Sequence, residues 1–152
     1  MDYEYFMKIA LKEARKSFES EDVPVGAVIV KDGKIIARAH NEVEKRKDAT
    51  RHAELLALSE AFKKVGYKHL LGSTVFTTLE PCPMCAGALV LARVKTVVFA
   101  AKDPKSGAGG SVINILSHSA LNHKIEVIGG VLEEESSQLL KDFFSKLRKT
   151  DE

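Results

Sequence analysis

The sequence predicts a three-layer α/β domain, in which helices cover both faces of one sheet. Stretches with helical hydrophobic spacing alternate with extended apolar stretches in the order αββαβαβ(α)βα, and this alternation is typical of such folds. The chain has 152 residues, of which 45% are hydrophobic, and contains no repeat, low-complexity segment or linker. We therefore expect a single domain that spans residues 1–152.

Each expected element follows from the local pattern of side chains. The strands are expected at 25–30, 34–39, 74–79, 96–101 and 125–128, and the principal helices at 2–20, 52–65, 82–92 and 133–148. The Asp32 and Gly33 pair between the first two strands is the strongest short signal for a β-hairpin. Gly66 ends the second helix. Glu80 and Pro81 mark the turn after the third strand.

Two connections are less regular. Charged residues fill positions 42–51, so we expect a loop there. About 23 residues separate the last two strands, which is enough for a crossover that lets them run parallel. Within this crossover, 107–110 is rich in glycine and indicates a turn, and the short apolar segment 112–116 is the optional helix.

Composition narrows the class of protein. No apolar run reaches the roughly 18 residues that a membrane-spanning helix needs. The N-terminus begins with acidic residues and lacks the basic start of a signal peptide, so we expect a cytoplasmic protein. The formal net charge of +2 is too small to demonstrate a nucleic-acid partner. The two cysteines, Cys82 and Cys85, have a spacing that indicates metal or redox chemistry in a cytosolic chain.

Two fragments carry the candidate chemistry. His52 and Glu54 open one expected helix, and Cys82 and Cys85 open another. A helix N-terminus stabilises thiolates, the form of cysteine that binds metal. The two cysteines are three positions apart and share a helix face, so His52 can complete a Cys₂His set. Three protein ligands are typical of a catalytic zinc site that keeps a water, whereas a structural site has four.

Glu54 is expected to move protons and not to bind the metal. It lies two positions from His52, and such residues do not share a helix face. A carboxylate there can take a proton from the zinc water and return it to a ring nitrogen and the leaving amine. Alone, Cys-x-x-Cys also suits a redox pair, and His-x-Glu is usually a surface pair. Together, in this order, they match the signature of zinc-dependent nucleobase deaminases.

The sequence resembles the bacterial tRNA adenosine deaminase family (TadA) over essentially its whole length. Segments 23–28 and 78–88 are similar to that family and to related guanine and cytosine deaminases. Segment 103–108, continued by 110–111 and later 122–123, resembles the tRNA branch in particular. The resemblance implies the cytidine deaminase-like fold with one mixed five-stranded sheet. It also implies a homodimer that binds a tRNA anticodon stem-loop and converts the wobble adenosine, usually of an arginine tRNA, to inosine.

The same resemblance suggests roles for five residues around the substrate. Asn41 matches an asparagine that hydrogen-bonds the flipped base, and the backbone amides of Ala53 and Val25 would line the base pocket. Asp103 matches a residue that contacts the RNA backbone. Phe144 matches an aromatic residue near the anticodon loop, although core packing is the simpler interpretation of a phenylalanine on the last helix.

The chain departs from the family beside the metal ligand. Many members have Asp-Pro-Thr-Ala before His-Ala-Glu, whereas this chain has Asp48-Ala49-Thr50-Arg51. Basic side chains crowd this region and could contact phosphates, although a solvated charged loop is equally compatible with them. They are Lys45, Arg46, Lys47 and Arg51. The alternative function is deamination of free guanine or cytosine, or of a nucleotide, on the same zinc core.

Overall fold

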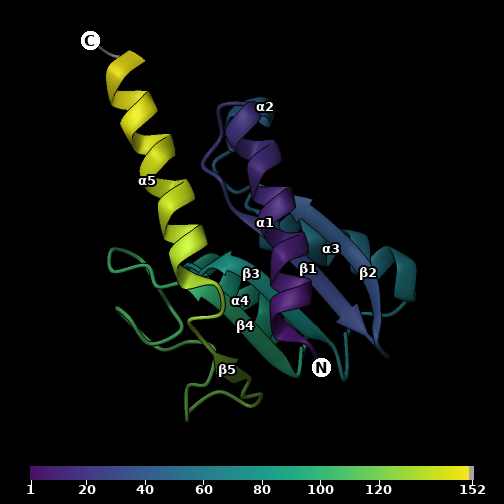
Figure 1. Cartoon of the computed structure of the whole chain (residues 1–152). Helices are drawn as coiled ribbons and strands as arrows, with labels where there is room; N and C mark the ends of the chain where they lie inside the picture. Colours follow the sequence, from purple (N-terminus) through teal and green to yellow (C-terminus); the bar gives the residue numbers. More distant parts are fainter. Residues whose placement is uncertain (151–152) are drawn as a thin grey trace.

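The computed structural model describes residues 1–150, which form an α/β fold around a five-stranded sheet in the order β2-β1-β3-β4-β5 (Figure 1). The strands are β1 (Gly26–Lys31), β2 (Lys34–His40), β3 (Thr74–Leu79), β4 (Thr96–Ala101) and β5 (Glu126–Ile128). Strand β1 pairs antiparallel with β2 and β3, whereas the β3–β4 and β4–β5 pairs are parallel. The expected mixed sheet is confirmed, and its last two strands run parallel, as the length of the crossover allows.

Helices cover both faces of this sheet. The helices are α1 (Tyr3–Glu19), α2 (Val43–Arg46), α3 (Ala53–Val65), α4 (Pro83–Leu91) and α5 (Glu133–Thr150). Side chains of β1 alternate between the faces: Ala27 and Ile29 pack in one apolar cluster with α3 and α4, and Val28 packs in the other with α1. Helix α5 packs against β4 and β3, and its C-terminal half extends beyond the sheet (Figure 1).

The hairpin between β1 and β2 forms where the sequence predicts it. Asp32 and Gly33 have φ angles of 51° and 75°, and a two-residue turn with positive φ at both positions matches the right-handed twist of the strands. The β1–β2 register shifts between Ile29 and Val30, which marks a bulge.

Two local expectations are wrong. Residues 42–51 are not entirely loop, because α2 forms within them. The buried Asp22 carboxylate accepts the backbone N–H groups of Glu44 and Lys45 and holds the start of this helix. Segment 112–116 forms no helix and instead contributes Asn114 to an isolated bridge with Gly109. Within residues 1–150, no helix combines the length and the apolar character needed to cross a membrane.

Candidate metal centre and base pocket

The candidate ligands lie at the N-termini of two helices that cover the same face of the sheet. His52 is the N-cap of α3 and Cys82 the N-cap of α4, both with extended backbone. Neither side chain makes the usual capping hydrogen bond to its own helix, so each is available to the site. Pro83 begins α4 at a position where its fixed φ and missing N–H suit the helix.

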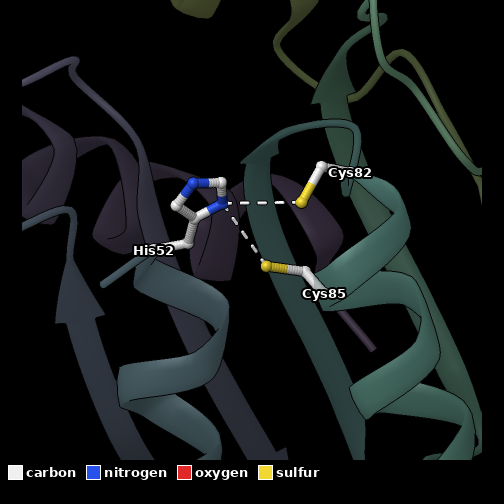
Figure 2. A group of neighbouring side chains, drawn as sticks. All are labelled: His52, Cys82 and Cys85. Atoms are coloured by element: carbon white, nitrogen blue, oxygen red, sulfur yellow. Dashed lines mark hydrogen bonds between the residues drawn. The ribbon is translucent and has the colours of Figure 1, made fainter. Parts of the chain in front are cut away.

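The three donor atoms converge at one point (Figure 2). His52 Nδ1 lies 3.5 Å from the Sγ of Cys82 and 3.5 Å from the Sγ of Cys85. A tetrahedral zinc ion with ordinary Zn–N and Zn–S bonds separates these ligand atoms by about 3.6 Å. The donor set therefore fits zinc both in chemistry and in spacing.

The two thiols have different pKa values because a hydrogen bond joins them. A hydrogen bond from Cys85 lowers the pKa of the Cys82 thiol to about 4. The same hydrogen bond, together with burial, raises the pKa of Cys85. A divalent cation at this point would stabilise both sulfurs as thiolates, the form that binds metal.

Glu54 lies beside this centre in the first turn of α3. Its side chain is buried, and burial raises the pKa of the carboxyl to about 7, against the opposing effect of the nearby His52. The group of metal donors found within residues 1–150 consists of His52, Cys82 and Cys85 and does not include Glu54. A carboxyl with a pKa near neutrality can both accept and donate a proton.

A cavity of about 280 Å³ opens over His52, Glu54 and Cys82. This volume is just below the usual range for small-molecule sites, roughly 300–1,000 Å³. Its walls come from four separate parts of the chain. The lining residues are Asp22, Val23, Val25, Asn41, Val43, Glu44, Ala49, His52, Glu54, Leu79, Glu80, Cys82, Asp103 and Ser106.

Comparison with known proteins decides the family. The MafB19-like deaminase family profile matches residues 1–148. The tRNA-specific adenosine deaminase of Bacillus subtilis (strain 168) is 53% identical over 146 residues, which cover 96% of this chain and 91% of that protein. The tRNA-specific adenosine deaminase of Aquifex aeolicus (strain VF5) is 52% identical over 148 residues, or 97% of each chain. This chain belongs to the tRNA-specific adenosine deaminase family.

Solved structures agree with this assignment to the tRNA-specific adenosine deaminases. A structure from a study of A-to-I editing by tRNA:A34 deaminases at the wobble position has a TM-score of 0.85 and 40% identity, over 89% of this chain and 98% of its own. A guanine deaminase from Nitrosomonas europaea has a TM-score of 0.81 and 27% identity, over 93% and 84%. The chain is an enzyme with a cytidine deaminase-like fold, and identity favours the tRNA branch.

The deaminase pocket contains three of the five residues that sequence reasoning placed around the substrate. Val25, Asn41 and Asp103 line it. Asn41 is nearly buried, and its Oδ1 accepts the backbone N–H of Ala53 at 2.7 Å. The Val25 carbonyl accepts the N–H of Asn41 at 3.0 Å, and the Val25 N–H donates to Val23. These bonds join β1, the end of β2 and the start of α3 behind the zinc ligand.

Asp103 and Phe144 occupy different surroundings. The Asp103 carboxylate accepts N–H groups from Lys105 and Ser106 and the Ser106 hydroxyl, so it caps its own turn at the rim of the pocket. Phe144 lies outside the base pocket on α5, is 40% exposed and packs edge-on against the buried Phe143. It lines two neighbouring clefts on either side of α5.

The basic residues before His52 are largely paired with acids of the same segment. Lys45 and Arg46 both contact Glu42, at 3.6 and 2.7 Å, and Arg51 contacts Asp48 at 3.1 Å. These partners reduce the attraction of the segment for phosphate. Sequence reasoning missed two further lining residues, the buried carboxylates Asp22 and Glu80. An acidic residue directly before the Pro-Cys pair was the only available signal for Glu80.

Proposed function

We propose that this chain hydrolyses adenosine to inosine at the wobble position of a tRNA anticodon, releasing ammonia. The observation that carries the proposal is that His52 and Cys82 line one small pocket together with the buried Glu54 carboxyl, while Cys85 completes the donor set beside them. His52, Cys82 and Cys85 hold one zinc ion per chain. When bound, zinc lowers the pKa of a coordinated water to about 7 and so supplies a nucleophile at neutral pH.

Glu54 transfers the protons of this reaction. It accepts one proton from the attacking water and delivers it to a ring nitrogen, then accepts the second proton from the new hydroxyl group on the attacked carbon and delivers it to the departing amine, which leaves as ammonia. Its position in the same pocket as His52 and Cys82 supports this assignment, as does the burial that raises its pKa to about 7.

Asn41 holds the base, and its neighbours shape the pocket. Its Oδ1 is engaged by Ala53, so its side-chain NH₂ is the group that we assign to the adenine. Val25 lines the pocket. Ala53 supports it from behind, because its N–H holds the Asn41 side chain in place. We assign Asp103 to the RNA contact at the rim, and Phe144 to the nucleotides that lie outside the pocket.

A basic cleft beside the pocket supports an RNA substrate. This cleft, of about 540 Å³, lies between α5 and the 101–105 segment, which also carries Asp103. Its charged lining consists of Lys102, Lys105, Lys141 and Arg148, and none of these forms an ion pair within residues 1–150. Unpaired cations next to an extruded base are suited to the flanking phosphates.

Assembly and location complete the proposal. We propose that residues 1–152 act as one deaminase domain and that two copies form a homodimer. Leu91, at the end of the apolar helix α4, is 79% exposed, and Val112 and Ile113 are also exposed, which supports an apolar contact surface. Sedimentation at micromolar concentration should give a dimer, and a monomer under these conditions would contradict the proposed homodimer. The cytoplasm is the compartment that we propose, because tRNA is the substrate, and arginine tRNA is the species expected.

A direct comparison of substrates tests the function. The purified protein is incubated with a short anticodon stem-loop carrying a wobble adenosine, and separately with free adenine, guanine and cytosine. Only the stem-loop should be deaminated efficiently. Rapid turnover of guanine without turnover of the stem-loop would favour the second candidate, a guanine deaminase. This candidate is considered because the guanine deaminase from Nitrosomonas europaea has a similar fold. Inosine-sensitive sequencing of total tRNA after incubation identifies the tRNA species.

A further inference from the structure

Glu80 is a buried carboxylate beside the zinc centre with no evident part in the chemistry. It directly follows β3, lies two positions before Cys82, lines the base pocket, and is 2% exposed. No lysine, arginine or histidine within residues 1–150 forms an ion pair with it. A buried carboxylate is unfavourable unless hydrogen bonds compensate its lost hydration, so its partners should reveal its role.

All of its side-chain partners lie in one segment, residues 103–111. Oε1 accepts the Asp103 N–H at 3.0 Å and also the hydroxyl of Ser111. Oε2 accepts the N–H groups of Gly109 and Ser111 at 2.9 and 3.1 Å. Each carboxylate oxygen thus has two donors, and hydrogen bonds to a charged acceptor are the stronger kind.

The backbone adds two further connections. The Glu80 N–H donates to the Ala101 carbonyl, and the Ala108 N–H donates to the Pro81 carbonyl, each at 2.8 Å. Gly107 packs so closely that a Cβ there would overlap the Glu80 carboxyl group. The 103–111 segment therefore contacts Glu80 and its neighbour Pro81 at several points. Within residues 1–150, its only β-type pairing is the isolated bridge between Gly109 and Asn114.

We propose that Glu80 is a positioning residue that fixes one wall of the base pocket. The proposal rests on the proposed function, because its catalytic consequence is placement of the adenosine. Asp103 and Ser106 belong to this wall and line the pocket. The four donors around the Glu80 carboxylate leave it no role as acid or base. A displacement of about 1 Å in a positioning group can lower a rate by about a hundredfold.

The test is Glu80→Gln, which keeps the size of the side chain but replaces one acceptor oxygen with an NH₂ group facing N–H donors. Zinc content should not change. Amide hydrogen exchange at Gly109 and Ser111 should accelerate by on the order of tenfold or more. The kcat/KM for the stem-loop should fall by roughly ten- to a hundredfold, mainly through KM, with the pH profile of kcat unchanged. Glu126→Gln is the matched control, because within residues 1–150 the Glu126 carboxylate accepts only the hydroxyl of Thr96, at the opposite end of β4.

Two further variants keep the proposal falsifiable if Glu80→Gln does not fold. Ser111→Ala removes one donor from an exposed residue and should give the same changes at smaller size. Gly107→Ala pushes the 103–111 segment and the Glu80 carboxylate apart while keeping the carboxylate itself, and should raise KM in the same way. Unchanged exchange and kinetics in Glu80→Gln would overturn the proposal, and so would lost turnover with a shifted pH profile and normal exchange. If the wild-type protein does not deaminate the stem-loop, the proposed function fails, whereas the exchange data still decide the role of Glu80.

Discussion

The floor of the base pocket and its rim are built by different means. The floor carries His52, Glu54 and Cys82, with Cys85 buried directly beneath. Regular helices that pack into the core place these residues. The rim consists of the start of α2 and of the 103–111 segment, which also forms one wall of the pocket. The buried carboxylate of Asp22 holds the start of α2, and that of Glu80 holds the 103–111 segment. A floor fixed by helix packing can stay constant while individual bonds adjust the rim. Proteins that differ in substrate, including a guanine deaminase, accordingly share this fold.

Removing a metal ligand should have the largest effect. The wild-type protein should contain about one zinc per chain, and Cys85→Ala should remove it together with all measurable turnover, because two donors remain from the set of three. Metal analysis of purified protein measures this directly. Met84→Leu, which alters the same helix without removing a donor, should retain zinc. A zinc-free native protein with a Cys82–Cys85 disulfide would instead restore the redox interpretation.

Glu54→Ala should be almost as severe in turnover but harmless to the metal. General acid–base catalysis typically contributes about 10²- to 10⁴-fold to a rate, so we expect kcat to fall by roughly that factor. Zinc content and the thermal unfolding midpoint of zinc-loaded protein should stay near wild type, and Glu54→Gln should behave alike. Parallel loss of zinc and activity would show that Glu54 is a ligand.

Asn41 lies between floor and rim, and two substitutions separate its roles. Asn41→Ala leaves the buried Ala53 N–H without its acceptor, so we expect a loss of about 1–3 kcal/mol in unfolding free energy together with reduced turnover. Asn41→Asp keeps an acceptor but lacks the NH₂ group, so turnover should fall while this hydrogen bond persists. Denaturant unfolding and single-turnover kinetics measure the two effects. Full activity in Asn41→Asp would restrict Asn41 to a structural role.

Charges outside the pocket should have the smallest effect on chemistry and a clear effect on binding. One variant replaces the four cleft cations, Lys102, Lys105, Lys141 and Arg148, with glutamine. Its matched control replaces Lys45, Arg46, Lys47 and Arg51, so that both variants remove the same charge. The cleft variant should flatten the dependence of log K on log salt by up to about 3, whereas the control should change it less, because three of its cations already contact acids. The opposite ranking would move the RNA to the segment before His52.

The sequence predicts the floor better than the rim, for a physical reason. His52 and Cys82 cap helices whose patterns are local, so a short motif and helical spacing are enough to place them. Helix α2 is held by Asp22, which lies 22 positions before Glu44, and the wall at Ser111 is held from 31 positions away. No local pattern contains such bonds. The pairing of Arg51 with Asp48 was missed for a different reason: the two residues are only three positions apart, but opposite charges in an irregular segment indicate contact only when the backbone is known.

Because the 103–111 segment is held by Glu80, the length of the crossover beyond Ser111 does not determine the shape of the pocket. Beyond Ser111 the crossover touches the core again through the fully buried Leu116, and residues 118–122 are exposed. Exposed backbone of this kind tolerates insertion, because few buried contacts depend on its path. A longer loop at 118–122 should therefore leave the adenosine site unchanged, because the contacts of Glu80 and the buried Leu116 both lie between the loop and the pocket along the chain. The enzyme can acquire new surface there, such as a tag, a reporter or a docking segment, without resetting the geometry around the zinc.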